Sequence, residues 1–210
     1  MSTDLTGQLR CYLVTDPRAG SVEALVRITR AALCGGMTAV QLRVKGWPDG
    51  AALQVAHALR LATRATGALF LVNDRVDLVL AAQADGVHLG VDDLPVSAAR
   101  SLLGPGAIIG YSPESDVDRD VAERAGADYL GVGPVFGTST KHDAGPAIGL
   151  EGLAAVVRAT TLPVIGIGGV TIERAPDVLA AGAVGVAVVG AVFLADHPEH
   201  AAHRLSAILS

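Results

Sequence analysis

A glycine-rich segment that carries hydroxyls and a lysine follows an apolar stretch near the middle of the chain. Residues 131–141 read Gly-Val-Gly-Pro-Val-Phe-Gly-Thr-Ser-Thr-Lys. Glycines let backbone N–H groups come close to an anion, and the hydroxyls and the lysine add side-chain donors and one positive charge. We therefore expect Thr138, Thr140 and Lys141 to contribute to a phosphate site.

Three polar side chains alternate with apolar ones around residue 41. Gln41, Arg43 and Lys45 are separated by Leu42 and Val44. Since side chains alternate in direction along a strand, the three polar groups point the same way. Two cations and an amide are costly inside a core unless an anionic ligand meets them. The alternative is an exposed edge strand with a solvated face, which a closed parallel barrel does not have.

Carboxylates follow two further predicted strands. Asn73 and Asp74 come after one apolar run, and Asp92 and Asp93 come after the next. Asp74 and Asp93 could share a divalent cation, because Mg²⁺ is usually held by one or two carboxylates together with substrate phosphate oxygens and water. The alternative is that these aspartates cap the helices expected directly after them.

Small or hydroxyl residues stand at three more predicted strand ends. Ser112 follows the fifth strand and could donate to the same anion, although alone it resembles an ordinary turn or cap residue. Gly169 follows the seventh strand, and Val189 and Gly190 end the eighth. Loops after strands seven and eight of (β/α)₈ barrels often bind phosphate through backbone N–H groups.

The elements that position these residues repeat as a strand followed by a helix. β-Branched runs predict strands at Cys11–Thr15, Ala39–Arg43, Leu69–Val72, Gly86–Leu89, Ala107–Gly110, Tyr129–Gly133, Val164–Ile167 and Gly185–Val189. Helical spacing of apolar residues predicts helices between them, at Val22–Leu33, Ala51–Ala65, Val117–Ala125 and Ala175–Ala180 among others. A small-residue motif before every second strand suggests a weak internal repeat. We predict one (β/α)₈ TIM barrel, as a single domain over residues 1–210.

Composition narrows the function classes. With a net charge of −5, only 3% aromatic residues and no basic run, the sequence does not predict nucleic-acid binding. Short, interrupted apolar segments and the lack of a signal-peptide pattern predict no membrane role and a cytoplasmic location. Cys11 and Cys34 are isolated, and His197, His200 and His203 fit an exposed helix better than a metal site. Oligomeric state is not indicated, and a homo-oligomer stays open.

Taken together, these residues resemble the thiamine phosphate synthase family. The resemblance covers nearly the whole chain, in order and spacing, and is carried by the segments 40–45, 73–78, 84–90, 131–143 and 163–169. It implies a magnesium-dependent transferase that joins 4-amino-2-methyl-5-hydroxymethylpyrimidine diphosphate to a thiazole phosphate, carboxylated or not. Both substrates are small molecules, and diphosphate is released.

The resemblance also implies a role for each matching residue. The pyrimidine diphosphate is held at Gln41, Arg43, Lys45 and Asn73, and Mg²⁺ at Asp74 and Asp93. Ser112 and Lys141 match groups near the leaving diphosphate and, with Arg43, form the predicted catalytic set. The thiazole phosphate site matches Thr138, Thr140, Gly169, Val189 and Gly190.

The sequence departs from the family pattern at Val91, Glu114 and Gly190, where Gln, His and Ser are common. Two other functions stay open: a thiazole tautomerase relative, and a barrel that binds a phosphorylated ligand without catalysis. The tautomerase uses a His near the fifth strand, which this chain lacks, and it needs no metal and diphosphate site. The glycines of residues 137–149 mark a candidate lid.

Overall fold

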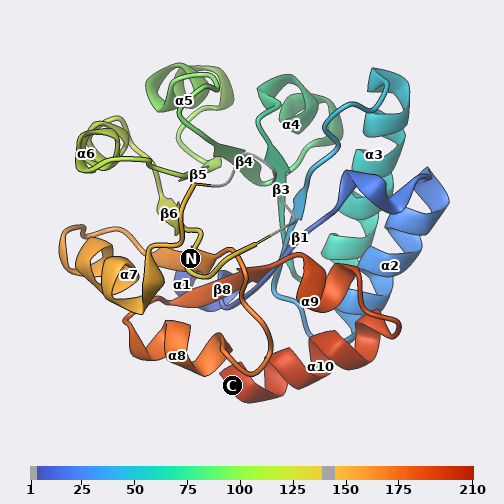
Figure 1. Ribbon diagram of the computed structural model, residues 1–210. Coiled ribbons are helices and arrows are strands. Elements are labelled where there is room, and N and C mark those ends of the chain that lie inside the picture. The colour runs from blue at the N-terminus through green and yellow to red at the C-terminus, as the bar shows by residue number, and fades with distance from the viewer. Residues whose placement is uncertain (1–3, 139–144) are drawn as a thin grey trace.

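Eight parallel strands close into a barrel in the computed structural model, which describes residues 4–138 and 145–210 (Figure 1). Each strand pairs with its neighbours in sequence order, and β8 pairs with β1. The strands are β1 (Cys11–Val14), β2 (Ala39–Leu42), β3 (Leu69–Asn73), β4 (Gly86–Leu89), β5 (Ile108–Tyr111), β6 (Tyr129–Val132), β7 (Val164–Ile167) and β8 (Gly185–Val188). The predicted (β/α)₈ barrel is confirmed, with each of the eight predicted strands within one residue of its observed bounds.

Helices surround the strands in Figure 1. They are α2 (Val22–Cys34), α3 (Asp49–Thr66), α4 (Val76–Ala82), α5 (Val96–Leu103), α6 (Asp116–Arg124), α7 (Gly149–Arg158), α8 (Ala175–Ala180) and α10 (Pro198–Leu209). Three shorter elements are α1 (Leu5–Gln8), the 3₁₀ helix η1 (Pro17–Ala19) and α9 (Gly190–Phe193). Because α10 packs against α2, the ring of helices closes as the strands do.

The apolar core has two parts because side chains alternate along each strand. On β1, Cys11 and Leu13 face the helices and belong to the large outer cluster. Tyr12 and Val14 point into the barrel, where they join a smaller cluster. Leu5 and Leu9 pack on this inner cluster from the N-terminal segment. The barrel is therefore packed through its interior, and space for a ligand is left at its carboxyl end.

The small-residue repeat has a structural basis at the amino ends of the strands. Asp85 precedes β4 and accepts the N–H of Phe70 at 2.8 Å, and Asp128 precedes β6 and accepts the N–H of Ile109 at 2.7 Å. Thr38 does the same for Cys11 at 2.9 Å. Val184 stands at the fourth such position and has no side-chain acceptor. Val184 lies at the amino end of β8, so the missing acceptor belongs to the scaffold and not to the carboxyl ends where the polar residues gather.

None of the helices in residues 4–138 and 145–210 is long and apolar enough to cross a membrane. The C-terminal histidines lie at the start of α10 and along it, as expected. No group of three or more His, Cys, Asp or Glu side chains suited to a metal occurs among the described residues.

Candidate active site

The predicted site residues converge on one large cavity at the carboxyl end of the barrel. Its volume of about 1310 Å³ exceeds the range of about 300–1,000 Å³ typical of single small-molecule sites. The cavity is lined by Gln41, Arg43, Lys45, Asn73, Asp74, Asp93, Ser112, Thr138, Gly169, Val189 and Gly190. Thr140 and Lys141, and residues 139–144 of the candidate lid, lie outside the described residues, so their roles stay predictions.

The polar residues of β2 line the cavity as their alternation predicts. Gln41 is buried in the barrel, whereas Arg43 and Lys45 follow the strand end, where Arg43 is partly buried and Lys45 is exposed. The Thr15 hydroxyl accepts the N–H of Arg43 at 2.9 Å and donates to its carbonyl oxygen at 3.2 Å, so Arg43 is held at a defined depth. Because the barrel is closed, the alternative of an exposed edge strand is excluded.

Two carboxylates meet where β3 and β4 end. Asp74 lies beside Asp93, and Lys45 Nζ is 3.5 Å from Asp74 Oδ2. Burial, together with the neighbouring Asp93 carboxylate, raises the pKa of Asp74 to about 6, although Lys45 opposes the shift. Asp93 Oδ2 also accepts the N–H of Gly90 at 2.7 Å, which orients it. Two neighbouring carboxylates repel each other when both are ionised, and a cation bound between them would relieve that repulsion.

Neither aspartate caps the helix that follows it. Asp74 has a positive φ of 64°, and its N–H donates to the carbonyl oxygen of His88 at 2.9 Å. Arg75 and Pro95 stand at the N-cap positions of α4 and α5, and neither helix has a side-chain cap. The capping alternative was therefore wrong, and both carboxylates are directed to the cavity.

The residues present fit a hard divalent cation. Aspartate oxygens suit Mg²⁺, which commonly binds one or two protein carboxylates and takes its remaining ligands from water and substrate phosphates. Asp74 and Asp93 supply such a pair, and Lys45 and Arg43 line the same wall. A cation here would also relieve the repulsion that raises the pKa of Asp74.

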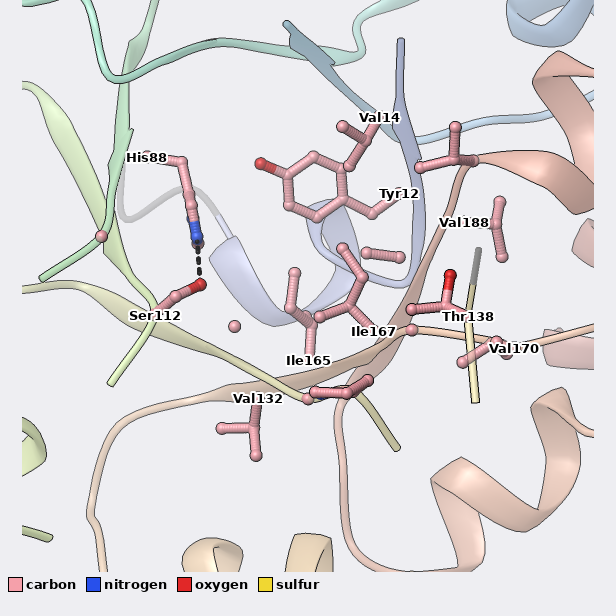
Figure 2. Close-up of a pocket in the computed structure, with 18 of the residues that line it drawn as sticks. Tyr12, Val14, His88, Ser112, Val132, Thr138, Ile165, Ile167, Val170 and Val188 are labelled. Atoms are coloured by element: carbon pink, nitrogen blue, oxygen red, sulfur yellow. Dashed lines mark hydrogen bonds between the residues drawn. The ribbon is translucent and has the colours of Figure 1, made fainter. Parts of the chain in front are cut away.

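Ser112 is also a cavity residue and not a helix cap. The N-cap of α6 is Ser115, whose hydroxyl accepts the N–H of Asp118. Ser112 Oγ instead lies 2.8 Å from His88 Nε2, as Figure 2 shows. Burial lowers the pKa of His88 to about 4, so the imidazole is neutral at physiological pH.

Sequence reasoning missed the polar groups inside the barrel. Tyr12 and His88 line the cavity floor, and Tyr129 contacts both. Burial raises the pKa of both tyrosines, so they remain protonated. The available signal was their position: each lies on a strand where the alternation turns side chains inward. Asp92, Arg119, Glu173 and Arg174 also line the cavity and were not predicted.

The loops after β6 and β7 form the opposite wall. Gly168 and Gly169 have positive φ values of 90° and 63°, and a Cβ on Gly169 would meet Phe136 Cβ at 2.8 Å. The N–H of Phe136 donates to the carbonyl oxygen of Gly168 at 2.9 Å, so the two loops are joined directly. The Arg174 guanidinium lies 4.7 Å from the Phe136 ring centroid and adds a cation–π contact.

A short extra helix begins beside this wall. After β8 the chain enters α9 at Gly190, with Val189 as its N-cap. Figure 2 shows Thr138, Val170 and Val188 on one side of the cavity and His88 and Ser112 on the other, with Tyr12, Ile165 and Ile167 between them. Barrels of this type often bind phosphate between the loops after strands seven and eight and a short extra helix. The cavity thus has two polar ends.

All three positions that depart from the family pattern, Val91, Glu114 and Gly190, line the cavity. The third, Gly190, has no heavy atom within 4 Å of the place where a Cβ would stand. Glycine lacks the hydroxyl of the Ser common at this position, but it keeps the backbone N–H at the start of α9.

The fold and the cavity define a (β/α)₈-barrel enzyme with an acidic pair at one end of its site and glycine-rich loops at the other. Residues 11–192 match the family model described as thiamine monophosphate synthase. The chain belongs to this family. It is a transferase of the thiamine-phosphate synthase type.

Proteins of this family are similar to this protein along almost its whole length. The thiamine-phosphate synthase of Roseiflexus castenholzii is 48% identical over 92% of this chain and 85% of its own length. That of Moorella thermoacetica is 46% identical over 95% of both chains. The solved thiamine phosphate pyrophosphorylase of Pyrococcus furiosus covers 98% of both chains with a TM-score of 0.89 and 41% identity. A 3-hexulose-6-phosphate synthase, at 17% identity and a TM-score of 0.72, shares the fold alone.

Proposed function

We propose that the cavity binds hydroxymethylpyrimidine diphosphate and thiazole phosphate side by side and holds Mg²⁺ between Asp74 and Asp93. The pyrimidine diphosphate lies toward Arg43, Lys45 and Asn73. The thiazole phosphate lies toward Thr138 and the loops after β7 and β8. The observation that carries this proposal is one cavity of about 1310 Å³ with a paired-carboxylate end and a glycine-rich end.

In the reaction, the bond between the pyrimidine methylene carbon and the diphosphate oxygen breaks, and a bond from that carbon to the thiazole nitrogen forms. The electron pair of the broken bond leaves with diphosphate. The methylene carbon becomes cationic and is delocalised into the aminopyrimidine ring. Catalysis therefore requires neutralisation of the leaving group and alignment of the thiazole nitrogen, without a dedicated general base.

The residues of the acidic end suit this requirement. Arg43 and Lys45 supply positive charge, and Ser112 supplies a hydroxyl. A bound Mg²⁺ supplies further charge neutralisation for the diphosphate oxygens. The apolar middle of the cavity, with Ile165 and Ile167, gives the two rings a surface on which to pack.

The direct test is turnover with both substrates and Mg²⁺. Thiamine phosphate and diphosphate should form in equal amounts, and a chelator should abolish their formation. No product at saturating substrates would overturn the synthase function, and product that is insensitive to the chelator would overturn the metal assignment. The paired carboxylates favour this function over a tautomerase, which would act on the thiazole phosphate alone. A cytoplasmic location and self-association remain predictions.

Mg²⁺ affinity should depend on pH because a proton and the cation compete for Asp74. Its pKa of about 6 means that the carboxyl is ionised above neutral pH and protonated below pH 6. The dissociation constant for Mg²⁺ should therefore be constant at pH 7.5–8.5 and rise about tenfold for each unit below pH 6. Calorimetric titration with Mg²⁺ over pH 5–8.5 measures this, and an affinity that does not change with pH would contradict it.

The hydroxyl of Thr138 should act mainly on the thiazole phosphate. We expect Thr138→Ala to raise the KM for thiazole phosphate about tenfold, the loss typical of a hydrogen bond to a charged group, with kcat nearly unchanged. Thr66→Ala, at the end of α3, is the matched control. Lys141→Ala is expected to lower kcat instead. If Thr138→Ala instead lowered kcat and left the KM for thiazole phosphate unchanged, the assignment of this hydroxyl to the thiazole phosphate would be wrong.

A further inference from the structure

Five polar side chains form a continuous chain of hydrogen bonds across the barrel interior. Gln41 Nε2 donates to Tyr12 Oη at 2.9 Å, and Tyr12 Oη lies 2.8 Å from Tyr129 Oη. Tyr129 Oη lies 2.8 Å from His88 Nδ1, and His88 Nε2 lies 2.8 Å from Ser112 Oγ. The chain joins the end of β2 to the end of β5, so its links are held by strands that are distant in sequence.

The direction of each bond follows if every tyrosine hydroxyl gives its proton to a neighbour within this series. The Gln41 amide nitrogen can only donate, so Tyr12 accepts there and its single proton is then directed to Tyr129. Tyr129 gives its own proton to His88 Nδ1. A neutral imidazole that accepts at Nδ1 carries its proton on Nε2, and this N–H donates to Ser112 Oγ. The hydroxyl proton of Ser112 is therefore not used in this series of bonds, and Ser112 can donate it to a ligand in the cavity.

We propose that Tyr12, Tyr129 and His88 are positioning residues that hold Ser112 as a hydrogen-bond donor toward the diphosphate. This inference rests on the proposed function, because an anion at this end of the cavity is what uses the donor. If Gln41 turned its amide oxygen to Tyr12, every bond would reverse. Ser112 would then donate to His88 and present only lone pairs, which repel a phosphate oxygen.

The packing supports a fixed geometry for the last link. A Cβ on Gly131 would lie 2.9 Å from His88 Cε1 and 3.3 Å from Ser112 Oγ. Glycine at this position of β6 thus leaves room for the pair. The side chain of His88 is only 9% exposed, and both its nitrogens face hydroxyl groups. A flipped ring would place carbon atoms where Nδ1 and Nε2 now meet Tyr129 and Ser112, and both hydrogen bonds would be lost.

Nitrogen NMR of the imidazole reads the proton position directly, without turnover. In the wild-type protein at pH 7.5, His88 should show a protonated Nε2 and an unprotonated Nδ1, with signals assigned by their absence from His88→Gln. Tyr129→Phe removes the donor to Nδ1, so the form protonated on Nδ1 should increase. A wild-type His88 that is protonated on Nδ1, or on both nitrogens, would overturn the proposal.

Binding of inorganic diphosphate with Mg²⁺ tests the consequence for Ser112. Ser112→Ala should weaken binding about tenfold, as expected for a lost bond to a charged group. Tyr129→Phe should weaken it about fivefold in the wild-type background and leave it unchanged in the Ser112→Ala background, because residues that act through one group are not additive. Equal losses in both backgrounds would mean that Tyr129 acts otherwise, and would overturn the proposal.

The third tyrosine of the protein provides a matched control. Tyr111 immediately precedes Ser112 but has no place in the hydrogen-bonded chain, so Tyr111→Phe should leave both the His88 signals and diphosphate affinity unchanged. A Tyr111→Phe effect as large as that of Tyr129→Phe would show a packing effect and contradict the proposal. Because both readouts are independent of product formation, failure of the synthase assay and failure of this inference are separable.

Discussion

Asp93→Asn is expected to lower kcat/KM about a thousandfold, because metal stabilisation of a leaving group contributes several kcal/mol and each tenfold loss corresponds to about 1.4 kcal/mol. Asparagine keeps the size of the side chain and an oxygen that can accept the N–H of Gly90. It removes one of the two charges that hold the cation. The loss should therefore come from chemistry and metal affinity with little change in folding.

The measurement is steady-state kinetics at several Mg²⁺ concentrations. High Mg²⁺ should restore part of the activity of Asp93→Asn. Removal of the neighbouring charge should also lower the pKa of Asp74, whose rise depends in part on Asp93. Asp196→Asn, an exposed aspartate outside the cavity, is the control and should keep full activity. An Asp93→Asn enzyme within tenfold of wild type at low Mg²⁺ would contradict the metal assignment.

Gly110→Ala is expected to destabilise the fold by about 3 kcal/mol, the upper part of the range for overpacking a dense core. A Cβ on Gly110, in β5, would overlap the ring and hydroxyl of Tyr129. Tyr129 is fully buried and its hydroxyl contacts Tyr12 and His88. The added methyl group therefore has no space unless the ring moves.

Thermal unfolding measures this effect. A loss of 3 kcal/mol corresponds to a fall in Tm of about 6–12 °C for a domain of this size. Gly106→Ala is the control, since no heavy atom lies within 4 Å of its added Cβ and its φ is not positive. If Gly110→Ala were as stable as Gly106→Ala, the close packing of Tyr129 on β5 would be wrong.

Much of the fold was predictable because the signals for it are local. Strand bounds follow from β-branched runs such as Gly86–Leu89 and Val164–Ile167, which the structure reproduces without change. The period of two in Gln41, Arg43 and Lys45 already indicated one common direction. Closure of the barrel made that direction the cavity, because a parallel barrel has no free edge.

The site residues expected from the sequence line one cavity wherever the structure describes them, but their contacts with one another were not predictable. The sequence could not decide between capping and metal binding for Asp74 and Asp93. An aspartate between a strand and the next helix is placed both to cap that helix and to face a site at the strand end. The capping alternative is removed because Arg75 and Pro95 stand at the N-caps of α4 and α5, and neither helix has a side-chain cap. The sequence assigned no role to Tyr12, Tyr129 or His88, and only the closure of the barrel brought β1, β4 and β6 together so that these side chains meet.

The sequence alone determined the class of fold, the strand ends and a list of candidate site residues, and those that the structure describes line one cavity. Periodicity and residue type are local properties, and they can be read from the sequence without knowing which residues are neighbours in space. The tertiary structure decided which groups touch: Asp74 with Asp93, and Ser112 with His88. Such pairs depend on the register and closure of strands far apart in the chain. Charge repulsion and hydrogen bonding between two side chains become strong only when the folded chain brings them into contact.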